Sequence, residues 1–123
     1  MLRSLLGYEL LSPAALNTLR TDPGVVILDA NARHSWLLAR VPGARHLDTL
    51  EFGSEQLPAD RNTTLVFYCS NFFCSKAPRA ARRARAMGFE RVHVLTSGIS
   101  GWIGAGLPVE QGVQTQSGDA IPT

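Results

Sequence analysis

The residues best suited to chemistry are the two cysteines, Cys69 and Cys74, which bound the segment Cys69-Ser70-Asn71-Phe72-Phe73-Cys74. A thiolate is a strong nucleophile, but a free thiol with a pKa near 8.5 is only about 3% ionised at pH 7. A short loop between a strand and a helix can favour the thiolate, because backbone N–H groups and the helix N-terminus stabilise a central anion. Cys69 is therefore the candidate nucleophile, with an inert buried thiol as the alternative.

Cys74 allows two interpretations. As a resolving thiol it would attack a persulfide or sulfenate on Cys69, releasing sulfide or water and leaving a Cys69–Cys74 disulfide. As a structural residue it would be a small, packed and unreactive side chain at the end of the loop. The separation of five positions in the sequence does not by itself ensure the Cα distance that a disulfide requires.

The segments around Cys69 alternate between strand and helix patterns. Apolar, largely β-branched runs predict buried strands at residues 25–28, 63–68 and 91–95. A shorter strand is expected at residues 44–47, between the first two. Helical patterns cover residues 12–19, 33–39 and 75–87 and a short segment that carries Trp102, while residues 48–62 form a connection with one helical turn.

This alternation predicts an α/β fold with a central, mostly parallel sheet and helices on both faces. Functional residues of such sheets gather at the carboxyl ends of the strands, where Asp29 and Cys69 fall. We expect Asp29 to support the site by accepting backbone hydrogen bonds that order the loops, rather than to act as a base.

The composition is that of an ordinary globular domain, since 45% of the 123 residues are hydrophobic and 18% are charged. We expect one domain over residues 1–110 and a flexible tail over residues 111–123. No apolar run approaches the roughly 18 residues of a membrane span, and the N-terminus lacks a signal-peptide pattern, so a cytoplasmic location without membrane contact is expected. The net charge of +2 does not suggest a nucleic-acid partner, and three scattered histidines suggest no metal site.

Several motifs, in order, resemble the single-domain rhodaneses, a family of sulfurtransferases. They are Leu11-Ser12-Pro13-Ala14-Ala15-Leu16, Val26-Ile27-Leu28-Asp29-Ala30-Asn31, Val41-Pro42-Gly43-Ala44, Val66-Phe67-Tyr68-Cys69, Ser97-Gly98-Ile99-Ser100-Gly101-Trp102 and Gly106-Leu107-Pro108-Val109. The resemblance implies a rhodanese fold in which Cys69 carries sulfur as a persulfide and the loop amides of residues 70 to 75 surround it.

The same resemblance implies a thiosulfate sulfurtransferase-like activity that moves sulfane sulfur from thiosulfate or another persulfide source to a thiophilic acceptor. The acceptor would be a thiol, cyanide or a protein, and neither an organic cofactor nor a metal is implied. The substrate-binding and persulfide-binding loop would comprise Ser70, Asn71, Phe72, Phe73, Cys74, Ser75 and Lys76.

The chain departs from the family pattern in four places. Many relatives carry Arg or Lys within the loop to hold thiosulfate, whereas this loop is uncharged up to Lys76, which puts efficient use of thiosulfate in question. Asn31 stands where Arg is usual, Ala39-Arg40 where Gly-His is usual, and Ser97 where Gly is usual. We expect these last three departures to affect packing and hydrogen bonding rather than chemistry.

Two other classes of function compete with this one. A phosphatase or arsenate reductase needs Cys-x5-Arg, because the Arg fork binds the oxyanion, but that position is Ser75, and Lys76 comes one residue too late. The remaining alternative is a thiol redox sensor or a protein-binding rhodanese-like module that uses Cys69 and Cys74.

Phe72 and Phe73 would either be exposed for an apolar acceptor or a protein partner, or be tucked against neighbouring loops. The arginines of the 75–87 helix would form a solvated face or attract anionic substrates, namely Arg79, Arg82, Arg83 and Arg85.

Overall fold

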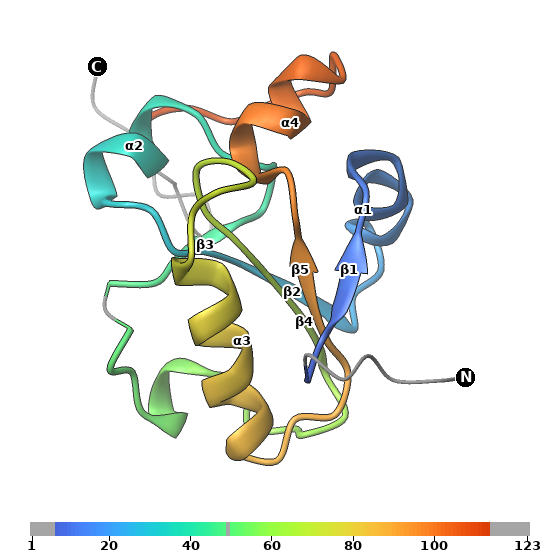
Figure 1. The fold of residues 1–123 in the computed structure, drawn as a ribbon, viewed down its shortest axis with the longest axis vertical. Coiled ribbons are helices and arrows are strands. Elements are labelled where there is room, and N and C mark those ends of the chain that lie inside the picture. Colours follow the sequence, from blue (N-terminus) through green and yellow to red (C-terminus); the bar gives the residue numbers. More distant parts are fainter. Residues whose placement is uncertain (1–6, 49, 114–123) are drawn as a thin grey trace.

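The computed structural model describes residues 7–48 and 50–113, which form a parallel sheet with helices on both faces (Figure 1). The sheet has five strands in the order β1-β5-β4-β2-β3, and each neighbouring pair is parallel. The strands are β1 (Glu9–Leu11), β2 (Val25–Asp29), β3 (Arg45–His46), β4 (Thr64–Tyr68) and β5 (Val92–Leu95). The helices are α1 (Pro13–Leu19), α2 (Arg33–Leu38), the 3-10 turn η1 (Ser54–Gln56), α3 (Lys76–Ala86) and α4 (Gly98–Gly104).

This arrangement confirms the predicted α/β fold and each predicted helix and strand to within one or two residues. The Ser12 side chain caps α1 by accepting a hydrogen bond from the Ala15 N–H at 3.1 Å. The patterns predict no strand before α1, yet β1 pairs with β5 at the edge of the sheet, with Glu9 opposite His93. A strand of three residues with partly exposed side chains is too short to show an alternating pattern in the sequence. β1 is therefore recognised as a strand only by its pairing with β5.

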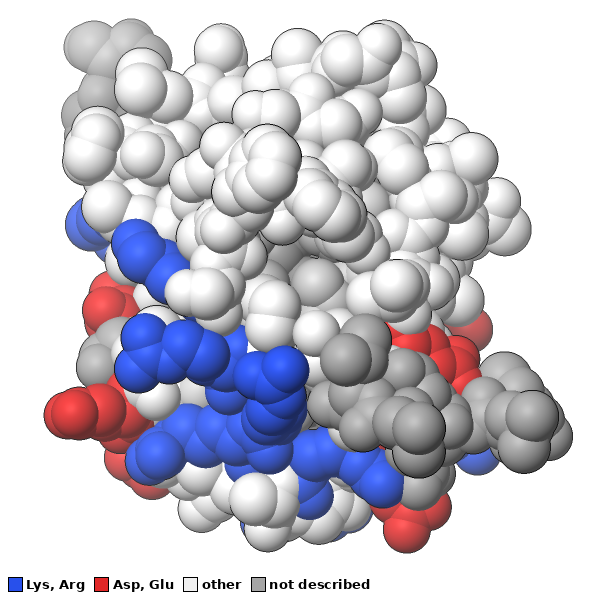
Figure 2. Space-filling view, in the orientation of Figure 1, with Lys and Arg blue, Asp and Glu red and all other residues white. Residues whose placement is uncertain are grey.

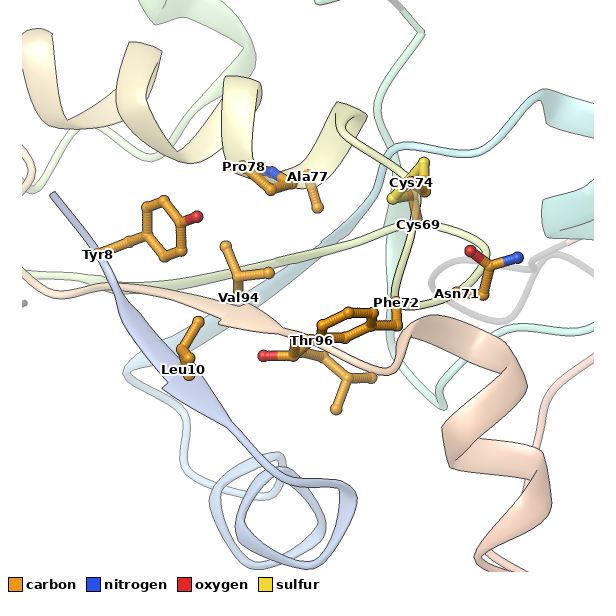
Figure 3. Close-up of a pocket in the computed structure, with 11 residues that line it drawn as sticks. Tyr8, Leu10, Cys69, Asn71, Phe72, Cys74, Ala77, Pro78, Val94 and Thr96 are labelled. Atoms are coloured by element: carbon orange, nitrogen blue, oxygen red, sulfur yellow. A yellow bond between two sulfur atoms is a disulfide. The ribbon is translucent and has the colours of Figure 1, made fainter. Parts of the chain in front are cut away.

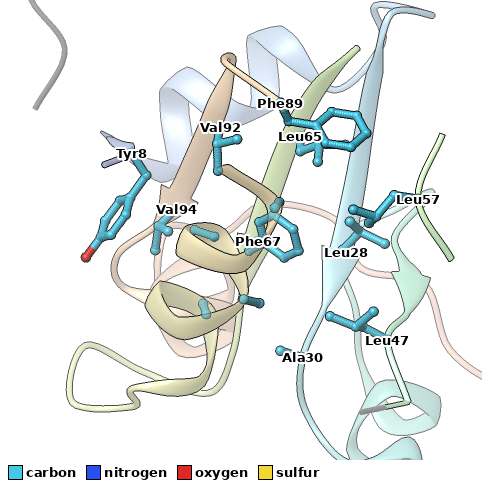
Figure 4. Packing of buried hydrophobic residues seen from close by; sticks show 14 of the residues in the cluster. Tyr8, Leu28, Ala30, Leu47, Leu57, Leu65, Phe67, Phe89, Val92 and Val94 are labelled. Carbon is cyan, nitrogen blue, oxygen red and sulfur yellow. The ribbon is translucent and has the colours of Figure 1, made fainter. Parts of the chain in front are cut away.

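The face of the sheet under α3 holds the larger part of the core. Four alanines of this helix are buried against β4 and β5, namely Ala77, Ala80, Ala81 and Ala84. Their small side chains let the helix approach Phe67 and Val94 closely, and Figure 4 shows these residues between the sheet and the helix. Because one face of α3 is committed to this contact, the basic side chains of the helix lie on the outside.

The opposite face of the sheet is covered by α1 and α4. Leu16 of α1 and Trp102 of α4 are fully buried there, together with Val66 and Tyr68 of β4. Successive residues of β4 therefore point to opposite faces and both sets are buried, which explains the continuous apolar run in the sequence.

Arg40, one of the departures from the family pattern, is a buried packing residue that holds the segment after α4. Its guanidinium carbon lies 3.9 Å from the centroid of the Trp36 ring, and Nη1 donates to the Gly112 carbonyl at 2.8 Å. Residues 40 and 110 also form an antiparallel bridge. The domain boundary at residue 110 stays a prediction, since residues 114–123 of the predicted tail lie outside the described residues.

Candidate active site

Cys69 directly follows the central strand β4, and its side chain is only 2% exposed. The first turn of α4 fixes the backbone at this point: the Ile99 N–H donates to the Cys69 carbonyl at 2.9 Å, and the Ser100 N–H donates to the Ser70 carbonyl at 3.0 Å. The start of the loop, residues 69 and 70, is therefore held by a helix that lies about thirty positions later in the sequence.

Gly98 makes this close approach possible. Its φ is +64°, and a Cβ built on it would lie 2.6 Å from both the Cys69 carbonyl oxygen and the Ser70 carbonyl carbon. Both the backbone conformation and the lack of space therefore require glycine here. The match of Gly98 to the C-terminal signature thus has a physical reason.

The second part of the loop is a turn organised by Asn71. Its side-chain oxygen accepts a hydrogen bond from the Phe73 N–H at 2.9 Å, and its carbonyl accepts one from the Cys74 N–H at 3.1 Å. These two amides, expected from the resemblance to surround the sulfur, are thus bonded to Asn71 in this structure. Phe72 and Phe73 are 66% and 89% exposed and contact each other edge to face, so neither is tucked into the core.

Cys69 and Cys74 are joined by a disulfide in this structure. Their Cα atoms are 6.3 Å apart, which lies within the ordinary range for disulfides. The turn at Asn71 brings Cys74 back toward the end of β4, so the loop allows the pairing that the sequence separation alone could not ensure. Thiol–disulfide exchange at Cys69 is therefore within the chemical reach of the site.

Asp29 ends β2, and its carboxylate is fully buried. Burial raises the pKa of Asp29, and hydrogen bonds with Tyr68 and Asn31 oppose that effect. The Asn31 N–H donates to Asp29 Oδ1 at 2.8 Å, and the Ser70 hydroxyl donates to Asn31 Oδ1 at 2.7 Å. Asp29 and Asn31 thus connect the end of β2 to the loop that begins at Cys69.

Tyr68, the last residue of β4, adds to this network, although the sequence alone indicates no role for it. Its hydroxyl accepts a hydrogen bond from the Val41 N–H at 3.1 Å, and burial raises its pKa. Because it sits in a strand of apolar residues, only its position next to Cys69 could have drawn attention to it.

Two pockets lie on either side of the carboxyl end of β4. The first, here called the apolar pocket, has a volume of about 290 Å³ and includes both cysteines (Figure 3). Its other described lining residues are Tyr8, Leu10, Asn71, Phe72, Ala77, Pro78, Val94, Leu95 and Thr96. The second, here called the Lys76 pocket, has a volume of about 260 Å³ and is lined by Ala30, Asn31, Ala32, Leu47, Asp48, Leu50 and Lys76.

The loop residues named by the sequence analysis are therefore divided between different environments. Asn71, Phe72 and Cys74 join Cys69 in the apolar pocket, whereas Lys76, the first residue of α3, lines the other pocket. Ser70 is bonded to Asn31, Phe73 lies in solvent, and Ser75 caps α3 without a side-chain hydrogen bond.

The basic groups of this face gather over α3. Figure 2 shows a band of Lys and Arg across the lower part of the view and a largely uncharged surface above it. The exposed basic residues of α3 are Lys76, Arg79, Arg82 and Arg83. Within residues 7–48 and 50–113, three or more His, Cys, Asp or Glu side chains never gather in a group that could hold a metal ion. No helix in that part of the chain has the length and apolar character needed to span a bilayer.

The fold and site together define a parallel α/β domain with a cysteine at the carboxyl end of its central strand. The family model described as a rhodanese-like domain matches residues 12–105, and the chain belongs to this family. Two solved structures share the fold. The BH2092 protein from Bacillus halodurans has a TM-score of 0.76 at 23% identity, covering 86% of this chain and 78% of its own. A thiosulfate sulfurtransferase from Pseudomonas aeruginosa has a TM-score of 0.73 at 27% identity, covering 85% of this chain and 20% of its own.

Curated relatives carry two different names. The HTH-type transcriptional regulator Rv0324 of Mycobacterium tuberculosis is 34% identical over 97 residues, which are 77% of this chain. The match covers 42% of that regulator, so the chain spans less than half of the relative's length. The thiosulfate sulfurtransferase GlpE of Ectopseudomonas mendocina is 27% identical, with 77% of this chain and 84% of the relative covered.

Proposed function

We propose that this domain is a rhodanese-type sulfurtransferase that carries sulfane sulfur as a persulfide on Cys69. The observation that carries this proposal is the place of Cys69, a buried thiol position at the carboxyl end of the central strand that lines a pocket of about 290 Å³. The similarity to proteins named thiosulfate sulfurtransferase supports the same activity.

The cycle begins once the Cys69–Cys74 disulfide has been reduced by a thiol or phosphine. The Cys69 thiolate then attacks the sulfane sulfur of a donor such as thiosulfate, whose S–S bond breaks and whose sulfite leaves with the electron pair. The outer sulfur of the resulting persulfide passes to an acceptor such as cyanide, and Cys69 is released as a thiolate. The organisation of residues 69 and 70 by α4 keeps the sulfur at one place through both steps.

A second candidate is a thiol redox sensor, and the Cys69–Cys74 disulfide specifically favours it. In that reaction a peroxide oxidises the Cys69 thiolate to a sulfenic acid, and the Cys74 thiol displaces water to form the disulfide. The two candidates differ in whether Cys74 is required, because sulfur transfer needs only Cys69.

Intact mass separates the two. The reduced parent protein, Cys69→Ser and Cys74→Ser are each incubated with thiosulfate and, separately, with a polysulfide. A gain of one sulfur that reductant removes, present in Cys74→Ser and absent in Cys69→Ser, is expected. If no variant gains sulfur and mild peroxide instead removes two hydrogens only when both cysteines are present, the sensor function replaces the transferase.

A further inference from the structure

The apolar pocket is an uncharged hollow next to the sulfur-carrying cysteine. Its walls come from β1, β5, the loop and α3, through side chains that converge on one space in Figure 3, namely Tyr8, Leu10, Phe72, Pro78, Val94 and Thr96. Among its described lining residues there is no Lys, Arg, Asp or Glu. Leu10 and Phe72 line the pocket and are also 55% and 66% exposed. The apolar surface of the pocket therefore continues to the solvent at these two residues.

Three basic side chains of α3 lie outside the lining of this pocket. Lys76 lines the other pocket, and Arg83 Nε donates to the Phe52 carbonyl at 2.7 Å. The Arg82 guanidinium carbon lies 5.6 Å from the centroid of the Tyr8 ring, and Arg82 is not among the described residues that line the apolar pocket. An anionic organic group in this pocket would meet no cationic side chain among the described lining residues, so the hydration it lost there would not be replaced by an ion pair with the wall.

The volume of the pocket suits a small organic group. A dry apolar cavity of about 150 Å³ is enough for benzene, so a pocket of about 290 Å³ accommodates one ring or a branched alkyl group together with a sulfur atom. The hydroxyls of Tyr8 and Thr96 and the Asn71 amide supply polar groups without charge. A thiol with several charged groups does not match this uncharged lining.

Building on the proposed function, we propose that this pocket binds the organic group of an uncharged, apolar acceptor thiol of aryl, arylalkyl or branched-alkyl type. The acceptor thiol gives its proton to solvent, and the resulting thiolate attacks the outer sulfur of the Cys69 persulfide. The bond between that sulfur and Cys69 Sγ breaks, a new S–S bond forms on the acceptor, and Cys69 leaves as a thiolate. The products are an organic persulfide and free Cys69, and no outside oxidant or reductant is consumed.

The test measures sulfur transfer from protein that has first been loaded with polysulfide and freed of excess donor. The acceptors are phenylmethanethiol, 2-mercaptoethanesulfonate and cyanide, with the two thiols compared at equal thiolate concentration. We expect transfer to phenylmethanethiol to be about tenfold faster than to the sulfonate, on the order of the effect of burying two methylene groups. Equal rates for the two thiols would overturn the inference and leave the proposed function intact.

A matched pair of variants ties the preference to the pocket. Leu10→Lys places a cation in the wall, whereas Ile103→Lys places one at a similarly exposed position of α4 outside it, since the two side chains are 55% and 51% exposed. The ratio of the phenylmethanethiol rate to the sulfonate rate should fall at least fivefold in Leu10→Lys and stay within twofold in Ile103→Lys. The same ratio in both variants and the parent would also overturn the inference.

A binding measurement keeps the pocket testable apart from the transfer reaction. Benzyl methyl sulfide, an unreactive thioether, is titrated into the reduced protein and followed by ligand-detected NMR. Saturable binding that weakens in Leu10→Lys and not in Ile103→Lys supports the pocket, and absence of binding to the parent overturns it. Failure of the parent to load sulfur from polysulfide would instead overturn the proposed function.

Discussion

The two pockets beside β4 differ in what they bring to the site. The apolar pocket reaches both cysteines and has no charged side chain among its described lining residues, whereas the Lys76 pocket contains Lys76 and Asp48 but neither cysteine. Sheet order explains the division, because β5 lies on one side of β4 and β2 on the other. The nucleophile and the nearest cation in the sequence therefore line different pockets, on different sides of the central strand.

The largest expected effect comes from disturbing the contact between Gly98 and the backbone of the loop. Gly98→Ala would place a Cβ 2.6 Å from the Cys69 carbonyl oxygen at a φ of +64°, so we expect a loss of about 2–4 kcal/mol in the free energy of unfolding. Sulfur loading of the folded fraction should also fall, because residues 69 and 70 must move. Urea denaturation and intact mass measure the two effects.

Gly104→Ala is the matched control for this prediction. It lies in the same helix, its φ is outside the left-handed region, and a Cβ there would meet no atom within 4 Å. Its stability should therefore stay within about 1 kcal/mol of the parent. Equal losses in the two variants would show that α4, rather than the contact of Gly98 with the loop, is the sensitive feature.

A cation introduced into the apolar pocket by substitution should make this pocket more like the Lys76 pocket. Phe72→Arg puts a guanidinium at an exposed position that lines this pocket, whereas Phe73→Arg puts one at the neighbouring position that does not. A charge pair about 4 Å apart is worth about 1 kcal/mol when it is fully screened by water, so Phe72→Arg should lower the KM for thiosulfate about fivefold, and more than Phe73→Arg does. Steady-state assays with cyanide as acceptor measure the KM for thiosulfate of both variants. Identical KM values would contradict the assignment of Phe72, and not Phe73, to the apolar pocket.

The buried carboxylate on the β2 side should give a pH-dependent effect. Because burial raises the pKa of Asp29 above its unfolded value, its contribution to stability is fully present below the unfolded pKa of about 3.8 and is lost as pH rises through the folded pKa. The free energy of unfolding of the parent should therefore fall relative to Asp29→Asn as pH rises from acid. Urea titrations of both proteins at several pH values check this, and parallel curves would exclude Asp29 as the group responsible.

The smallest expected effect concerns the cation of the Lys76 pocket. Lys76 is exposed and does not line the pocket that holds Cys69, so Lys76→Ala should raise the KM for thiosulfate by only about two- to threefold, through weakened attraction in solvent. The effect should fade at higher salt. A loss of tenfold or more that persists at high salt would place Lys76 in direct contact with the donor.

The sequence predicts the sheet well because the runs around Val66 and Val94 are buried on both faces, and it predicts Cys69 because the thiol follows one of these runs directly. It could not predict the apolar pocket, whose walls come from segments as distant as Tyr8 and Val94 and include the short strand β1. Periodicity carries information about which face a residue occupies, but not about which distant loops meet. The turn at Asn71, which brings Cys74 to Cys69, is likewise closed by one side-chain and one backbone hydrogen bond that no hydrophobic pattern predicts.

The contact with α4 divides the loop into a first part whose backbone is held by α4 and a second part whose backbone is not. The carbonyls of Cys69 and Ser70 accept hydrogen bonds from α4, whereas the turn that follows is closed by hydrogen bonds from the Phe73 and Cys74 N–H groups to Asn71. Insertions and grafts should therefore be tolerated only after Ser70, where extra length changes the shape of the pocket mouth without shifting the sulfur. Substrate range can in this way be redesigned, by selection or by engineering, while the position of the reacting atom stays the same.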